Sequence, residues 1–77
     1  MSETTSTVSA NLRAVMAIRK LTIGALAREL GVTRQTAGLY YGGLKPMTGD
    51  QIAAAARWLG VSVGDLFMQE PYELAAA

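Results

Sequence analysis

Residues 21–43 form the stretch LTIGALARELGVTRQTAGLYYGG, which decides the fold of this 77-residue chain. Thr22 stands where a helix N-cap is expected, because its hydroxyl can accept a hydrogen bond from an unpaired backbone N–H. Leu26 and Leu30 then follow at helical spacing. Gly31 suits the left-handed residue that ends a helix. The first half of the stretch therefore predicts a short helix that ends in a tight turn.

A second short helix is predicted directly after this turn, with Thr33 as its cap and Gly42-Gly43 as its end. Its inward face is predicted to contain Ala37, Tyr40 and Leu44. Its outward face is predicted to contain Arg34, Gln35, Gly38 and Leu39. Two short helices joined at a steep angle by a glycine-containing turn form a helix-turn-helix, here at about residues 22–41.

Three further helices are predicted around this motif, and together the five give an all-α, compact bundle of short helices. The first runs from Val8 or Ser9, a possible cap, to residue 20, with Arg13 facing outward. The fourth follows a capping box formed by Thr48 and Gln51. The last is predicted to begin at Ser62 and to bury Val63, Leu66 and Phe67.

The chain is predicted to contain one small domain at residues 8–67. Residues 1–7 are polar and small, and we expect them to be disordered. Residues 68–77 form a C-terminal tail, for which fraying and docking on the domain or on a second subunit are equally open. Trp58 is interpreted as a lid over the core in preference to an anchor for a partner.

Charge and composition exclude several classes of function. The formal net charge is only +1, but residues 1–57 have a net charge of +4 and residues 58–77 have −3. A positive body with a negative end fits a surface that faces phosphates. The chain has no Cys and no His, so we expect no enzyme, cofactor or metal site. No apolar run approaches the roughly 20 residues that span a bilayer, and we expect a cytoplasmic protein.

The motif also resembles a known family. Thr22, Leu26-Ala27, Gly31-Val32-Thr33, Tyr40 and Gly43 are similar to the helix-turn-helix of the Cro/C1-type (lambda-repressor-like) family. The segment LGVSVGDLF at residues 59–67 resembles the last helix of the same domains. The resemblance covers about residues 8–67. It implies an all-helical domain that binds double-stranded operator DNA, usually as a dimer.

Candidate contacts follow from the placement of the second motif helix. Arginine can bind guanine and glutamine can bind adenine through two hydrogen bonds in the major groove. The predicted base contacts are Arg34, Gln35, Gly38 and Leu39. The predicted phosphate contacts are Thr22, Thr33, Thr36, Lys45, Arg19 and Arg28. These contacts predict a sequence-specific transcriptional regulator, such as a small phage-type Cro or repressor protein, that associates with the nucleoid when bound to DNA.

An alternative function is a helix-turn-helix used as a protein-interaction module, as in an antitoxin. Ile23 stands where the family usually has a glutamine, and Tyr41 stands where it often has a glutamate. If Ile23, Leu39 and Tyr41 all face outward, they form an apolar patch of the kind that marks protein partners. Salt dependence separates the two functions, because phosphate contacts weaken steeply as salt rises.

Overall fold

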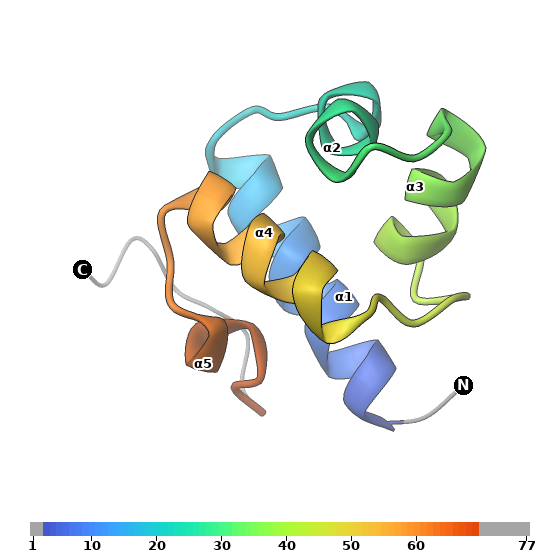
Figure 1. Ribbon diagram of the computed structural model, residues 1–77. Coiled ribbons are helices and arrows are strands. Elements are labelled where there is room, and N and C mark those ends of the chain that lie inside the picture. The colour runs from blue at the N-terminus through green and yellow to red at the C-terminus, as the bar shows by residue number, and fades with distance from the viewer. Residues whose placement is uncertain (1–2, 70–77) are drawn as a thin grey trace.

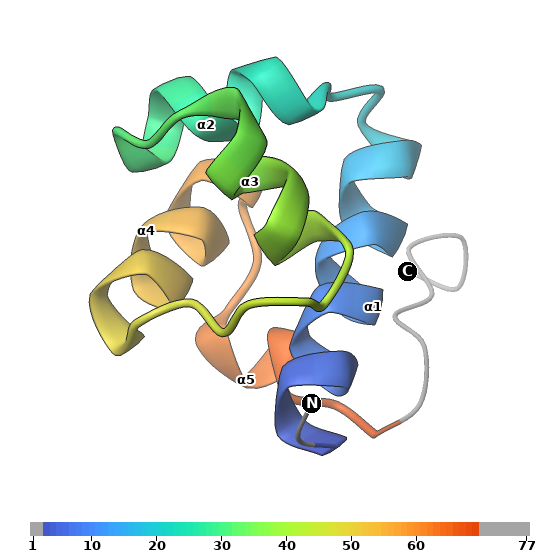
Figure 2. The ribbon, with the colours of Figure 1, turned by 90° about the vertical axis from the view of Figure 1, so that its right-hand side faces the viewer.

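Five α-helices and no strand occur in the part of the chain that the computed structural model describes, residues 3–69. They are α1 (Glu3–Ile18), α2 (Ile23–Leu30), α3 (Arg34–Tyr41), α4 (Gly49–Leu59) and α5 (Val63–Leu66) (Figure 1). In Figure 2, α1 and α4 stand on either side, α2 and α3 close the top, and α5 closes the bottom. The predicted all-α bundle of five short helices is confirmed.

One apolar core lies between these helices, because each contributes an inward face at helical spacing. The largest fully buried apolar side chains are Leu12, Val15, Met16, Leu26, Leu59 and Leu66. Burying one such Leu or Met stabilises the fold by roughly 1.5–3 kcal/mol. Trp58 is half-buried and packs against this core, as expected for a lid.

Side-chain caps fix where four of the helices begin. Thr22 Oγ1 accepts a hydrogen bond of 3.1 Å from the Ala25 N–H, and α3 begins in the same way at Thr33. α4 has the predicted capping box, in which the Gln51 N–H donates to Thr48 Oγ1 (3.2 Å) and the Thr48 N–H donates to Gln51 Oε1 (2.9 Å). Ser62 caps α5. The predicted starts of α2 to α5 are therefore confirmed.

The start of α1 differs from the expectation. The helix begins at Glu3, not at Val8 or Ser9. Ser9 is not a cap: it is 3% exposed, and its hydroxyl donates to the Ser6 carbonyl (3.1 Å) inside the helix. Serine and threonine have modest helix propensity, but the inward side of this turn packs on the domain through Val8 and Ser9. Tertiary packing therefore extends the helix beyond its local sequence preference.

Three predicted core residues are exposed in the structure. Leu44 is 66% exposed, because Gly43 (φ 75°) turns the chain out of the helix before α3 can continue its inward face. Val63 and Phe67 are 41% and 39% exposed. α5 is only four residues long, so one side chain, Leu66, reaches the core from it. The end of the predicted C-terminal tail, residues 70–77, lies outside the described residues.

Candidate nucleic-acid interface

The helix-turn-helix forms as the sequence predicts. Gly31 is left-handed (φ 68°), and the Val32 N–H donates to the Ala27 carbonyl (3.0 Å) across the end of α2. Val32 itself packs against the core and ties the turn to the domain. Since α2 and α3 leave this turn in different directions (Figure 1), α3 sits at the edge of the molecule with one side uncovered by other helices.

One face of α3 anchors the helix and another face is exposed. Ala37 is 0% exposed and Tyr40 is 5% exposed, so this face is fixed against the domain. Arg34 and Gln35 are exposed in the first turn, and Leu39 is 36% exposed. Figure 2 views the molecule from the side on which α3 lies in front. The structure therefore places Arg34, Gln35 and Leu39 on the exposed side of α3, whereas Gly38 is half-buried. Their contact with bases stays a prediction.

The threonines near the helix starts already have partners within the chain. The Thr36 N–H donates to Thr33 Oγ1 (3.1 Å), and the Thr33 hydroxyl donates to Thr36 Oγ1 (3.0 Å). Thr22 caps α2. These bonds place the three side chains at the N-terminal ends of α2 and α3, where helix dipoles favour anions. Their contact with phosphate stays a prediction.

The basic residues predicted to contact phosphates are all exposed: Arg19, Arg28 and Lys45. Lys45 lies just after α3, and its ammonium nitrogen is 5.9 Å from the centre of the Tyr40 ring. A cation over an aromatic face is held by the ring quadrupole. This contact positions one charge beside α3, whereas Arg19 and Arg28 make no such contact with an aromatic ring in residues 3–69.

A basic residue outside the predicted site holds the end of α3. Arg13 was expected to face outward, but it is half-buried, and its Nη1 donates to the Tyr41 carbonyl (2.7 Å). Its guanidinium carbon also lies 6.0 Å from the centre of the Tyr41 ring. A cation at a helix C-terminus is favourable, because unpaired carbonyls gather there. Arg13 thus braces α3 from α1, a role that sequence spacing did not reveal.

The apolar patch considered for a protein partner does not form. Ile23 and Tyr41 are partly buried and pack against the core, so only Leu39 of the three is exposed. Helix α2 turns Ile23 inward beside Leu26, and the contact with Arg13 holds Tyr41 against α1. The condition for this patch, that all three residues face outward, is therefore not met.

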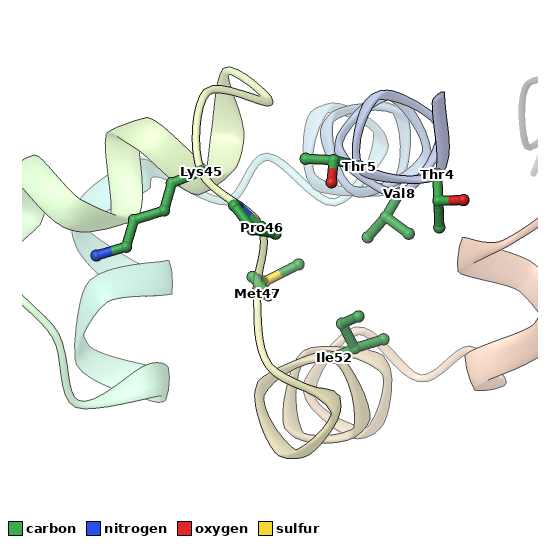
Figure 3. Close-up of a pocket in the computed structure, with 7 residues that line it drawn as sticks. All are labelled: Thr4, Thr5, Val8, Lys45, Pro46, Met47 and Ile52. Atoms are coloured by element: carbon green, nitrogen blue, oxygen red, sulfur yellow. The ribbon is translucent and has the colours of Figure 1, made fainter. Parts of the chain in front are cut away.

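A small cavity of about 150 Å³ lies between α1, α4 and the loop after α3 (Figure 3). Its lining residues are Thr4, Thr5, Val8, Lys45, Pro46, Met47 and Ile52. Figure 3 shows the Lys45 amino group pointing away from the cavity, while Met47 and Ile52 face into it. The cavity is therefore mainly apolar. Within residues 3–69, no cluster of acidic side chains could hold a metal ion.

Helices that could cross a membrane do not occur among the described residues, since none is both long and apolar enough. Comparisons with curated proteins and with solved structures gave no match. A family model described as the Cro/C1-type HTH DNA-binding domain matches residues 11–71, which is most of the chain and includes the whole motif. The chain therefore belongs to the Cro/C1-type HTH DNA-binding domain family.

Proposed function

We propose that this protein is a sequence-specific transcriptional regulator of the small phage-type Cro or repressor kind, which binds operator DNA through α3. The observation that supports this best is the placement of Arg34 and Gln35. Both are exposed in the first turn of a helix whose other face is buried through Ala37 and Tyr40. The first residues of a recognition helix are those that reach base edges.

The proposed roles follow from side-chain chemistry. Arg34 binds guanine O6 and N7, and Gln35 binds adenine N6 and N7. Gly38 and Leu39 lie further along the same helix and meet the groove without hydrogen bonds. The proposed phosphate contacts are Thr22, Thr33, Thr36, Lys45, Arg19 and Arg28. The protein acts in the cytoplasm, on the nucleoid when it is bound to DNA, and has no catalytic role.

Binding of random-sequence DNA tests this function directly. In-vitro selection with the purified chain should enrich one sequence, and Arg34→Ala should weaken binding to it by about 1–3 kcal/mol and relax one base position. Arg57→Ala is the matched control, because it removes the same charge from an exposed position on α4. A selection that enriches no sequence contradicts the proposal, and an identical loss in both variants removes Arg34 from base reading.

We also propose that two copies bind one operator. One α3 offers few base contacts, and dimers of helix-turn-helix proteins bind half-sites about one helical turn apart. Val63 in α5 and Phe67 directly after it have exposed apolar side chains, and α5 lies at the far end of the molecule from α3 (Figure 1). A second copy docked there leaves both α3 helices free to contact DNA.

Light scattering on the protein–operator complex tests this assembly. Two chains per operator are expected, and the selected sequence should be an inverted repeat. Phe67→Glu should reduce the stoichiometry to one chain and weaken binding, whereas Leu44→Glu, at an exposed apolar residue away from α5, should leave two chains bound. One chain per operator for the unmodified protein contradicts the dimer.

A further inference from the structure

We propose that Gly38 and Leu39 read a thymine: the Leu39 side chain contacts the 5-methyl group in the major groove, and Gly38 lets the helix come close enough. This inference rests on the proposed function and specifies one base of its operator. It assigns to the apolar part of α3 a role that arginine and glutamine cannot perform, because the thymine methyl accepts no hydrogen bond.

Among residues 3–69, neither the backbone conformation nor the packing requires a glycine at position 38. Its φ is not positive, unlike that of Gly31, Gly43 and Gly60, and a Cβ built there would meet no atom within 4 Å. Gly43 is the contrast: its φ is 75°, and a Cβ there would lie 2.7 Å from Ser9 Oγ. Glycine inside a helix is less favourable than alanine. The bare backbone at Gly38 therefore leaves room for a surface outside the chain to come close to α3.

Leu39 is a single apolar side chain within a polar face. It is 36% exposed, and Ile23 and Tyr41 turn to the core. A second exposed leucine, Leu44, follows the helix, and its N–H donates to the Leu39 carbonyl (2.9 Å). Two leucines form only a small surface for a protein partner, since hot spots cluster in larger packed groups. Leu39 is nevertheless well matched to one methyl group, which is the apolar feature that the major groove displays.

The spacing along α3 predicts where this thymine lies. Gln35 and Leu39 are four residues apart, so they lie on the same side of the helix about one turn, or 5.4 Å, from each other. Base pairs are stacked about 3.4 Å apart. The thymine should therefore lie about one or two base pairs from the adenine that Gln35 contacts.

Replacing thymine with deoxyuridine, one position at a time, tests the methyl contact. Deoxyuridine pairs normally but lacks the 5-methyl group, so a loss reports that group alone. For the unmodified protein, one position in each half-site should lose about fourfold in affinity, the equivalent of one buried methyl group. Leu39→Ala should bind thymine and deoxyuridine equally at that position. Arg34→Ala, weaker overall, should keep the difference.

Gly38→Ala tests the close approach separately. The alanine should raise the melting temperature of the free protein, because the helix gains propensity and the side chain meets no neighbour. The same variant should bind the selected operator at least tenfold more weakly. A raised melting temperature with unchanged operator affinity would overturn the close approach.

The outcomes separate this inference from the function on which it rests. If selection enriches a sequence in which no deoxyuridine substitution lowers affinity, the thymine contact is wrong and the regulator assignment stands. A methyl effect that persists in Leu39→Ala also overturns the inference. If no sequence is enriched, the proposed function itself fails. The three results are therefore distinguishable in one set of binding measurements.

Discussion

Asn11 shows how one polar residue organises a part of the fold that sequence reasoning left unexplained. It is 1% exposed, and its Nδ2 donates to the Leu66 carbonyl (3.0 Å) and to the Met68 carbonyl (2.9 Å). These carbonyls follow the last turn of α5, a helix too short to pair them itself. The sequence does contain an indication of this contact, because position 11 falls on the inward face of the helix between Val8 and Leu12. A polar residue at an inward helical position indicates a buried hydrogen bond.

Removal of this side chain should destabilise the domain without altering α3, the proposed recognition helix. Asn11→Ala leaves the buried Leu66 carbonyl and the part-buried Met68 carbonyl without this donor, which costs about 1–3 kcal/mol. Thermal unfolding followed by circular dichroism should show a melting temperature lower by roughly 4–8 °C per kcal/mol. Thr4→Ala, at an exposed position of the same helix, should show no such loss. Equal melting temperatures for the two variants would mean that water replaces the amide.

Four helix ends in the described chain share one pattern of backbone hydrogen bonding. At four ends, an N–H donates back to the carbonyl five residues earlier across a left-handed residue. The pairs are Leu21 to Met16, Val32 to Ala27, Leu44 to Leu39 and Val61 to Ala56, at 2.9–3.0 Å. The left-handed residue is glycine in three of them and Lys20 (φ 57°) after α1. This geometry is the Schellman motif, in which glycine avoids the steric cost of a side chain.

Replacing Lys20, the one left-handed residue of these four that is not glycine, with glycine should stabilise the protein. A left-handed conformation costs an L-residue about 1–2 kcal/mol, and greater freedom of glycine in the unfolded chain offsets part of that gain. Lys20→Gly is therefore expected to raise the free energy of unfolding by about 1 kcal/mol in urea denaturation. Gly31→Ala is the reverse control, because its Cβ would have room and only the backbone strain remains. A loss of stability in Lys20→Gly would contradict this account.

At the scale of elements, local chemistry made the helix starts and stops predictable. Each capping side chain bonds to a backbone group within three residues, so the local sequence is enough to predict where the helix begins. The caps are Thr22, Thr33, Thr48 and Ser62. The early start of α1 was not predictable in this way, since it depends on contact with the loop at Gly43. The exposure of Leu44 depends on the same loop. Long-range packing therefore limits what helical spacing can predict.

In the candidate site too, local features were predictable from the sequence and long-range contacts were not. Exposure of Arg34 and Gln35 followed from the cap at Thr33 and the helical period. The bracing of α3 by Arg13 joins residues 28 positions apart in the chain, and no local pattern reports such a pair. The position of Tyr41 beside Arg13 depends on the same long-range contact, with 6.0 Å between the guanidinium carbon and the ring centre.

At the scale of the whole molecule, charge distribution matters more than net charge. The acidic part of the chain includes Asp65, whose carboxylate is fixed by the Ser62 N–H (3.0 Å) on α5, remote from α3. Lys45 is held near α3 through the Tyr40 ring. A chain with a net charge of only +1 can therefore present a local positive surface to phosphates while its opposite end repels them.

Salt titration of operator binding measures this asymmetry. Affinity should fall linearly on logarithmic axes, with a slope of about −0.9 for each phosphate neutralised. Lys45→Met keeps an unbranched side chain but removes one charge, so the slope should become shallower by about 1 for each bound chain. Arg57→Met removes an equal charge from α4, outside the proposed phosphate contacts, and should leave the slope unchanged. Equal changes of the slope in both variants would mean that the net charge of the protein, and not the placement of charge beside α3, governs its attraction to DNA. A slope near zero for the unmodified protein would mean that the binding surface makes no phosphate contacts.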